Sequence, residues 1–381
     1  MRSKFYSIFI LAIVTTMIGC RSALKLYQKG KYDEAVEVAA KKLQKDPGNL
    51  SLQNTIIEAY RYAVNDHESA IASYEASNND LKWEWIYNEY ASLQRLYDAI
   101  YRSPQVYQLV QPIDYSSFLV TYAEKAGEVH FERGLAWMRN YDKGSFKNAY
   151  SEFQTALKFI PGDQEVISRM NEAYELAVTN VVILPVTRYD FQFSSYNYDY
   201  NNYNDRLISD LKYNSGNRFV KFYSPAEARN LNVRVDRVIE LQMQNLMIGR
   251  VSETRKAREV SKEVVTKEIT YKPDSVVKVY GTVKAKVNTI ERARHSEGSM
   301  LITIRNESGR ILWTDVLSSH DDWYSVFATY TGDDRALSDS DKKLLSRKEE
   351  FLPSEGDVIN YIYGDLISNS SYKIRDYFSR M

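Results

Sequence analysis

The spacing of apolar residues changes once along the chain, near Asn180, and this change divides the sequence into two parts of different fold class. Between Ser22 and Asn180, apolar residues recur every three or four positions, which is typical of amphipathic helices. The next segment, Val181–Val186, is a short apolar run of the kind expected for a strand buried on both faces. We therefore predict an α+β chain, with an all-α domain over residues 20–179 followed by a small α/β domain with a mixed sheet over residues 180–381.

The N-terminal segment combines a basic start, a short apolar stretch and a cysteine. Arg2 and Lys4 precede the apolar stretch Phe5–Ile18, which is too short to span a membrane. Gly19 stands directly before Cys20, the only cysteine of the chain. This arrangement resembles the lipobox of bacterial lipoproteins, which implies cleavage before the cysteine and lipidation of its thiol. The alternative is a conventional signal peptide with an incidental cysteine.

The location of the protein follows from this resemblance. Residues 1–19 are expected to be removed as a signal peptide, and Cys20 is expected to carry the lipid. Arg21 stands where enterobacterial lipoproteins of the inner membrane have aspartate, so we predict a lipid-anchored protein of the outer membrane that faces the periplasm. No later segment approaches the roughly 18 apolar residues of a membrane-spanning helix, and a single thiol excludes an intramolecular disulfide.

Two segments of the helical part resemble tetratricopeptide repeats. Small alanines let two antiparallel helices approach each other, an aromatic residue fills the remaining gap, and a proline ends the second helix. The resemblance implies a surface that binds a peptide or helix of a partner protein. The residues that carry it are Gly30, Tyr32, Ala35, Ala39, Lys42 and Pro47 in the first segment, and Ala149, Phe153, Ala156 and Pro161 in the second.

Between these segments, the chain is predicted to form long helices that are rich in aromatic residues. Trp83, Trp85 and Tyr90 are our candidates for partner-binding residues there, and the alternative is that they form the core between helices. A stripe of three glutamates follows at four-residue spacing, formed by Glu124, Glu128 and Glu132. No Glu-x-x-His spacing accompanies the stripe, so we interpret it as a solvated acidic helix face and predict no metal site.

In the second part, strands and helices are predicted to alternate at first, and long strands and a C-terminal helix follow. The segment Arg250–Thr270 mixes charges of both signs, and its sequence leaves helix and extended hairpin open. The predicted elements are strands at Phe219–Tyr223, Val238–Met247 and Val276–Ile290, a helix that starts at Ser224, a hairpin of Met300–Arg305 with Ile311–Val316, and a final helix at Gly356–Phe378.

This second part resembles the domain of the curli-secretion-channel lipoprotein and of the lipoprotein activators of penicillin-binding proteins, a topology also similar to the N-terminal domain of the Tol-system β-propeller protein. The segments that carry the resemblance are Val181–Val186, Tyr280–Val283 and Leu301–Trp313. The resemblance implies that the domain binds or regulates another envelope protein. The chain departs from the family in Arg250–Thr270, whose charges would be costly against lipid, and this argues against a secretion pore.

A tyrosine-rich segment directly follows the first predicted strand. Loops at this position of such sheets bind ligands and partners, and tyrosine and asparagine suit adaptable contact surfaces. The candidate partner-binding residues of this loop are Tyr196, Tyr198, Tyr200 and Tyr203, and the alternative is a plain soluble loop.

No catalytic constellation is found. The chain has no phosphate-binding loop, dinucleotide fingerprint, nucleophile elbow or His-Glu-x-x-His motif. His320–Asp322 and the downstream carboxylates lack the spacing of a calcium loop, and we expect capped turns or a helix start at Ser338 instead. The downstream carboxylates are Asp333, Asp334, Asp339 and Asp341. We therefore predict no enzyme, no cofactor and no metal. With 50 basic and 50 acidic residues the net charge is zero, which argues against nucleic-acid binding.

Together these features predict a non-catalytic, membrane-anchored periplasmic lipoprotein. We expect it to act as a scaffold or as an accessory or activator subunit of a cell-envelope complex, with protein partners bound through the helical repeats. Two alternatives stay open: a component of a secretion or surface-assembly complex, and an envelope hydrolase with a divergent site. The sequence sets neither the partner nor the oligomeric state.

Overall fold

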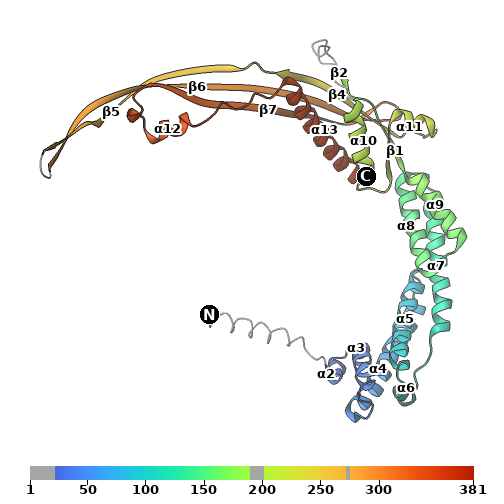
Figure 1. The fold of residues 1–381 in the computed structure, drawn as a ribbon. Coiled ribbons are helices and arrows are strands. Elements are labelled where there is room, and N and C mark those ends of the chain that lie inside the picture. The colour runs from blue at the N-terminus through green and yellow to red at the C-terminus, as the bar shows by residue number, and fades with distance from the viewer. Residues whose placement is uncertain (1–21, 189–200, 272–274) are drawn as a thin grey trace. The chain divides into compact units, whose positions relative to one another are not determined.

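The computed structural model describes residues 22–188, 201–271 and 275–381 (Figure 1). It divides into two compact units, of which the first ends at Ala177 and the second begins at Val178. The first unit consists of helices and the second contains a mixed sheet, so the fold class predicted from the sequence is confirmed. Cys20 lies outside the described residues. No helix in the described part of the chain is long and apolar enough to cross a membrane.

The first unit is an array in which successive long helices pack against each other. Their apolar positions form the interfaces, and Ala35, Ala39, Ala149 and Ala156 are fully buried, as the repeat-like spacing predicts. The helices are α2 (Ala23–Gln28), α3 (Tyr32–Leu43), α4 (Leu50–Glu75), α5 (Lys82–Tyr101), α6 (Pro104–Val110), α7 (Ser116–Met138), α8 (Lys143–Phe159) and α9 (Gln164–Ala177).

Helix α7 begins earlier than the sequence pattern indicates. The spacing of apolar residues predicts a helix over Ala123–Arg139, but the helix begins at Ser116. The carboxylate of Asp114 accepts a hydrogen bond from the Ser116 N–H at 2.9 Å and satisfies one of the donors that a helix start leaves open. Gln111, with φ of 48°, ends α6 in a left-handed conformation and so separates the two helices.

The contact between α7 and α8 depends on glycine. A Cβ atom at Gly134 would lie 2.4 Å from the ring of Phe153, and one at Gly127 would lie 2.9 Å from the side chain of Ile160. Phe153 is fully buried, so its ring has little room to move away. Gly134 therefore sets how closely these two helices approach.

In the second unit, a mixed sheet is covered by helices. The strand order is β3-β1-β4-β6-β5, with β2 on β4 and β7 on β6, and β1 is parallel to both β3 and β4. The elements are β1 (Thr179–Ile183), β2 (Thr187–Arg188), α10 (Asn201–Tyr213), β3 (Val220–Tyr223), α11 (Pro225–Asn230), β4 (Arg237–Ile248), β5 (Ser252–Tyr271), β6 (Ser275–Asn306), β7 (Ile311–Gly332), the 3-10 turn η3 (Asp334–Ala336), α12 (Asp339–Leu345) and α13 (Glu355–Ser379).

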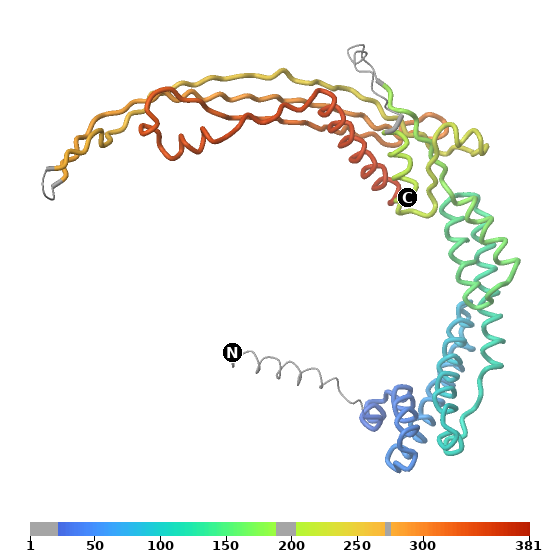
Figure 2. Tube along the Cα trace, viewed as in Figure 1, coloured from blue at the N-terminus to red at the C-terminus, as the bar shows by residue number. Residues whose placement is uncertain are grey.

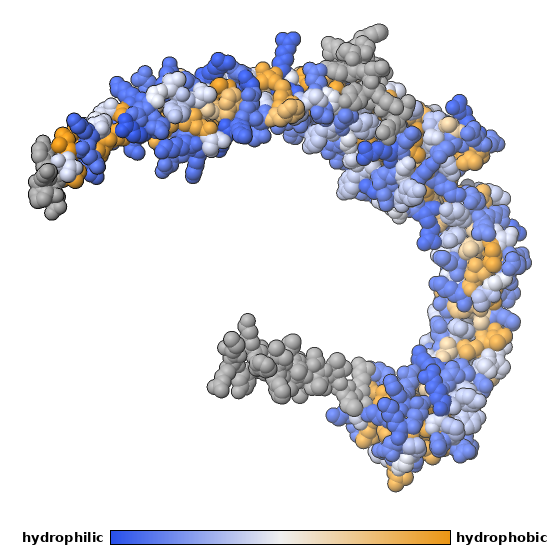
Figure 3. All heavy atoms as spheres, in the orientation of Figure 1, coloured by the Kyte–Doolittle hydropathy of each residue, from blue (hydrophilic) through white to orange (hydrophobic). Residues whose placement is uncertain are grey.

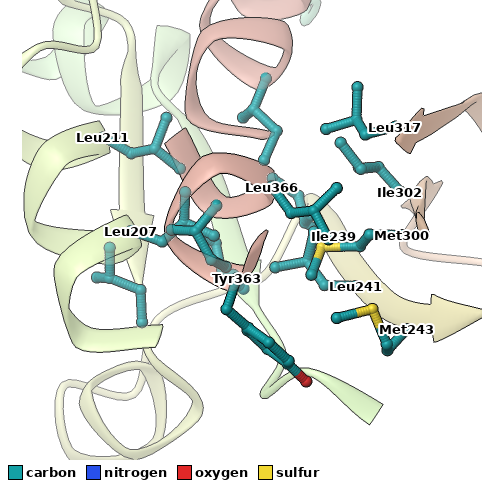
Figure 4. Close-up of a cluster of buried hydrophobic side chains, with 14 of the residues drawn as sticks. Leu207, Leu211, Ile239, Leu241, Met243, Met300, Ile302, Leu317, Tyr363 and Leu366 are labelled. Carbon is teal, nitrogen blue, oxygen red and sulfur yellow. The ribbon is translucent and has the colours of Figure 1, made fainter. Parts of the chain in front are cut away.

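The main core of this unit lies between the sheet and the helices α10 and α13 (Figure 4). Aliphatic side chains from both helices meet those of β4, β6 and β7, and Ser224 starts α11 with the capping box that its sequence predicts. The labelled core residues are Leu207, Leu211, Ile239, Leu241, Met243, Met300, Ile302, Leu317, Tyr363 and Leu366.

Beyond this core, β5, β6 and β7 continue as a long ribbon (Figure 2). The sequence of Arg250–Thr270 leaves helix and hairpin open, and in the structure this segment belongs to strand β5 from Ser252 onward, paired with β6. The two predicted strands Val276–Ile290 and Met300–Arg305 are parts of the single 32-residue strand β6. His320–Asp322 lie inside the 22-residue strand β7 and form no turn. The capped turn and the helix start predicted downstream are present, because Asp333 caps η3 and Ser338 caps α12.

The ribbon is partly covered on each face. Met300 and Ile302 of β6 face the core under α13, whereas Ala285 and Val287 face a smaller cluster that includes Leu344 of α12. The two pairs differ in parity along the strand, so they lie on opposite faces of the sheet. Elsewhere hydrophilic and hydrophobic side chains alternate on the visible surface of the ribbon (Figure 3).

We expect Gly134→Ala to lower the free energy of unfolding of the helical unit by about 1–3 kcal/mol, because the added methyl group forces Phe153 out of its packed position. The measurement is chemical denaturation followed by far-UV circular dichroism. The matched control is Gly364→Ala in α13, where a Cβ meets nothing within 4 Å. The control should be neutral or stabilising, and an equally neutral Gly134→Ala would contradict the packing argument.

Candidate partner-binding groove

A groove of about 540 Å³ lies on the surface of the helical unit, between α7 and the start of α5. The start of α5 contributes one aromatic wall, and α7 contributes a mixture of small apolar and charged side chains. The lining residues are Asp80, Trp83, Lys125, Glu128, Val129, Glu132, Arg133 and Ala136.

Trp83 forms the aromatic wall of the groove, and its indole is half-buried. The ring centroid of Tyr122 lies 5.9 Å from that of Trp83, which supports the indole from the side of α7. Two ammonium groups lie near the indole, with Lys125 Nζ at 4.4 Å and Lys82 Nζ at 4.8 Å from its centroid. At these distances the cations are attracted to the ring electrons, so the indole is held in place and both charges are engaged.

The charges of the groove divide into engaged cations and unengaged carboxylates. Arg133 Nε lies 3.1 Å from Glu152 Oε1, so this guanidinium is also engaged. Asp80, Glu128 and Glu132 have no ion-pair partner within the described part of the chain. The groove therefore presents negative charge to solvent beside an aromatic and aliphatic floor.

A histidine clamp lies beside the groove and joins three helices. His130 of α7 places Nδ1 2.6 Å from Glu152 Oε2 of α8 and Nε2 3.3 Å from Glu84 Oε2 of α5. The ring of Phe159 stacks on the imidazole, with 5.8 Å between centroids. His130 is buried, so these contacts fix α5 relative to α7 and α8 and keep the two walls of the groove in place.

A second histidine clamp holds the other part of α5. His67 of α4 donates from Nδ1 to Glu89 of α5 at 2.5 Å and from Nε2 to Asp33 of α3 at 3.1 Å. Arg95 lies 3.7 Å from Asp33 and 3.0 Å from Glu37, so cations and carboxylates alternate across the three helices. The hydrogen bond to Asp33, followed by that to Glu89, raises the pKa of His67 to about 9 despite its partial burial.

The three aromatic candidates of this region have different environments. Trp83 lines the groove, whereas Trp85 packs against Tyr74 with 5.4 Å between ring centroids. Tyr90 stacks on Phe118 at 4.8 Å and also on Tyr122 at 5.1 Å. The alternative interpretation, core between helices, applies to Trp83 and Tyr90, which both pack against the buried cluster around Leu93, and Trp83 in addition lines the groove.

Other groove residues were not selected from the sequence as partner-binding candidates. In the sequence, Glu128 and Glu132 indicate only an acidic helix face, and no motif distinguishes Lys125 or Val129. The sequence shows that Glu128 and Glu132 are four residues apart on one helix face. It does not show that this face lies beside Trp83. No group of three or more His, Cys, Asp or Glu residues within residues 22–188, 201–271 and 275–381 is arranged to hold a metal ion.

The tyrosine-rich segment is described only at its end. Tyr196, Tyr198 and Tyr200 lie outside the described residues. Tyr203 was expected in the same loop, but it lies in helix α10, where its ring contacts Tyr363 at 5.6 Å and its hydroxyl donates to Asn360 Oδ1 at 2.8 Å. Tyr203 also lines a pocket of about 360 Å³ between α10 and α13.

Comparison with models of protein families and with curated proteins finds no match. Among solved structures, the chain is similar to a thermophilic tetratricopeptide-repeat protein from Thermus thermophilus. The two chains are 16% identical, and the match covers 40% of this chain and 94% of the other, with a TM-score of 0.11. The conclusions about the groove therefore rest on its own geometry.

We expect His67→Gln to lower the free energy of unfolding by about 1–2 kcal/mol at pH 7, a figure reduced for the partial exposure of the carboxylates. The folded-state pKa lies above the unfolded value of 6.5, so this stabilisation is complete below that pH and is lost as the pH rises through about 9. Denaturation of wild type and variant between pH 6 and pH 10 measures it. A difference that stays constant over this range would contradict the clamp.

Proposed function

We propose that this chain is a non-catalytic, lipid-anchored scaffold of the bacterial envelope that recruits a protein partner through its helical unit. The observation that carries the proposal is the groove beside Trp83, which combines an aromatic wall, an aliphatic floor and unengaged carboxylates. Such a combination suits a protein segment, since aromatic residues in partly buried positions contribute much of the binding energy at protein interfaces. The lipobox-like sequence at Cys20 supports the anchor.

The long ribbon favours a second candidate function, a subunit of a larger assembly in the envelope. Val277, Val279 and Tyr280 of β6 are 40–59% exposed in the part of the ribbon that extends past β7. A two-stranded segment with exposed apolar residues is only marginally stable alone. A defined oligomer in detergent-extracted protein supports this candidate, and a strict monomer excludes it.

Affinity purification of the intact protein from its own envelope, after mild cross-linking, tests the recruitment of a partner. We expect a stoichiometric envelope protein to be captured, and we expect Trp83→Ala to reduce the captured amount at least tenfold because the wall of the groove is lost. Trp85→Ala is the matched control, since Trp85 is on the same helix but does not line the groove. Equal losses for the two variants, with both still folded, would exclude the groove as the binding site.

Metabolic labelling with a palmitate analogue tests the anchor. Because lipidation requires the thiol of Cys20, the wild-type chain should carry the label and Cys20→Ser should carry none. Cys20 is the only cysteine, so no other thiol complicates the result. Label that persists on Cys20→Ser, or is absent from the wild type, would contradict the proposed anchor.

A further inference from the structure

We infer that the groove beside Trp83 binds a basic segment of the partner protein, in which an apolar side chain packs against the indole and Lys or Arg side chains flank it. This inference rests on the proposed function, because it specifies the partner of the same groove. It is argued from the distribution of charge, from the shape of the floor and from the spacing of two glutamates.

The distribution of charge sets the sign of the partner. Arg133 pairs with Glu152, and Lys125 lies over the Trp83 ring, where it keeps its positive charge. The carboxylates that line the groove outnumber these two cations. The carboxylates of Asp80, Glu128 and Glu132 have no ion-pair partner among the described residues. An acidic segment would place its carboxylates beside those of the groove, whereas Lys or Arg side chains would neutralise the groove carboxylates. Such charge complementarity acts mainly on the specificity and the association rate of binding.

The apolar residues of the groove indicate that the partner segment contains an apolar side chain as well as basic ones. Val129 and Ala136 of α7 also line the groove and add apolar area among the charged groups. An apolar side chain placed there is removed from water and contacts the aromatic wall. A segment with only basic residues would leave the aromatic wall in water, so we expect an apolar residue between the basic ones.

The spacing of the glutamates sets the spacing of the basic residues. Glu128 and Glu132 are four residues apart on α7 and therefore lie on one face, about 6 Å apart along the helix axis. An extended peptide places alternate side chains at a similar separation of about 6.5 Å. In an extended Lys-Leu-Lys segment the two lysines point to one side and the leucine to the other. The lysines can therefore meet Glu128 and Glu132 of α7 while the leucine points toward the Trp83 wall, and the lysine stems cover the apolar area of α7.

Fluorescence anisotropy of labelled peptides with the full-length protein tests this inference. The probes are otherwise identical peptides with a central Lys-Leu-Lys, Lys-Ser-Lys, Gln-Leu-Gln or Glu-Leu-Glu. We expect Lys-Leu-Lys to bind most tightly, with weaker binding at higher salt. We further expect the double variant Glu128→Gln with Glu132→Gln to weaken it at least tenfold, and Trp83→Ala to weaken Lys-Leu-Lys more than Lys-Ser-Lys.

The matched control is the double variant Glu124→Gln with Glu165→Gln. It changes the net charge by the same amount, and Glu124 belongs to the same acidic stripe of α7 but does not line the groove. We expect this control to bind the Lys-Leu-Lys peptide within twofold of the wild type. An equal loss in the control would show attraction to overall charge only and would overturn the inference.

The outcomes separate this inference from the proposed function. If the Gln-Leu-Gln or Glu-Leu-Glu peptide binds best in a Trp83-dependent manner, the groove is a protein-binding site but the basic partner is excluded. If no peptide shows Trp83-dependent binding while capture of the envelope partner still depends on Trp83, the inference fails and the scaffold function stands. If neither depends on Trp83, both fail.

Discussion

The position of helix α5 is the constraint on which the groove depends. Two histidine clamps hold this helix. His67 contacts Glu89 of α5 and a carboxylate of α3, and His130 contacts Glu84 of α5 and a carboxylate of α8. Each clamp joins three helices through charged or polar contacts of defined direction, whereas apolar packing alone leaves helices freer to slide. Because α5 supplies one glutamate to each clamp, Trp83 at its start is held at a fixed place beside α7, and a preformed groove costs its partner little ordering of the scaffold.

Much of the helical unit was predictable from local sequence, because buried alanines and glycines report directly on close helix contacts. Ala35 and Ala149 are fully buried, as the repeat-like spacing predicts, and Gly134 lies against Phe153. The candidate site was less predictable. Trp83 and Tyr90 lie on one helix and both contact Tyr122, and what separates them is packing from Phe118, which comes from a later helix and stacks on Tyr90. A single sequence does not place such distant contacts.

In the second unit, patterns of apolar residues predict the buried strands but not the exposed ones. Strands buried in the core were predicted close to their observed ends, as for β3 and β4. The bounds of the ribbon strands were not predicted, because much of both faces of the ribbon contacts water. At such positions a strand can contain polar residues such as His320–Asp322. The pairing of β6 with β5 and β7 is set by long-range register, which the alternation of side chains indicates only where one face is buried.

Site-specific photo-crosslinking in living cells tests the central claim, that the groove is where the partner binds. A photoreactive amino acid at Val129, on the groove floor, is compared with the same residue at Val120, which is on α7 but outside the groove and 62% exposed. If the partner binds in the groove, position 129 gives one dominant protein adduct and position 120 gives none. An adduct from position 120 alone, or equal adducts from both positions, would contradict the central claim.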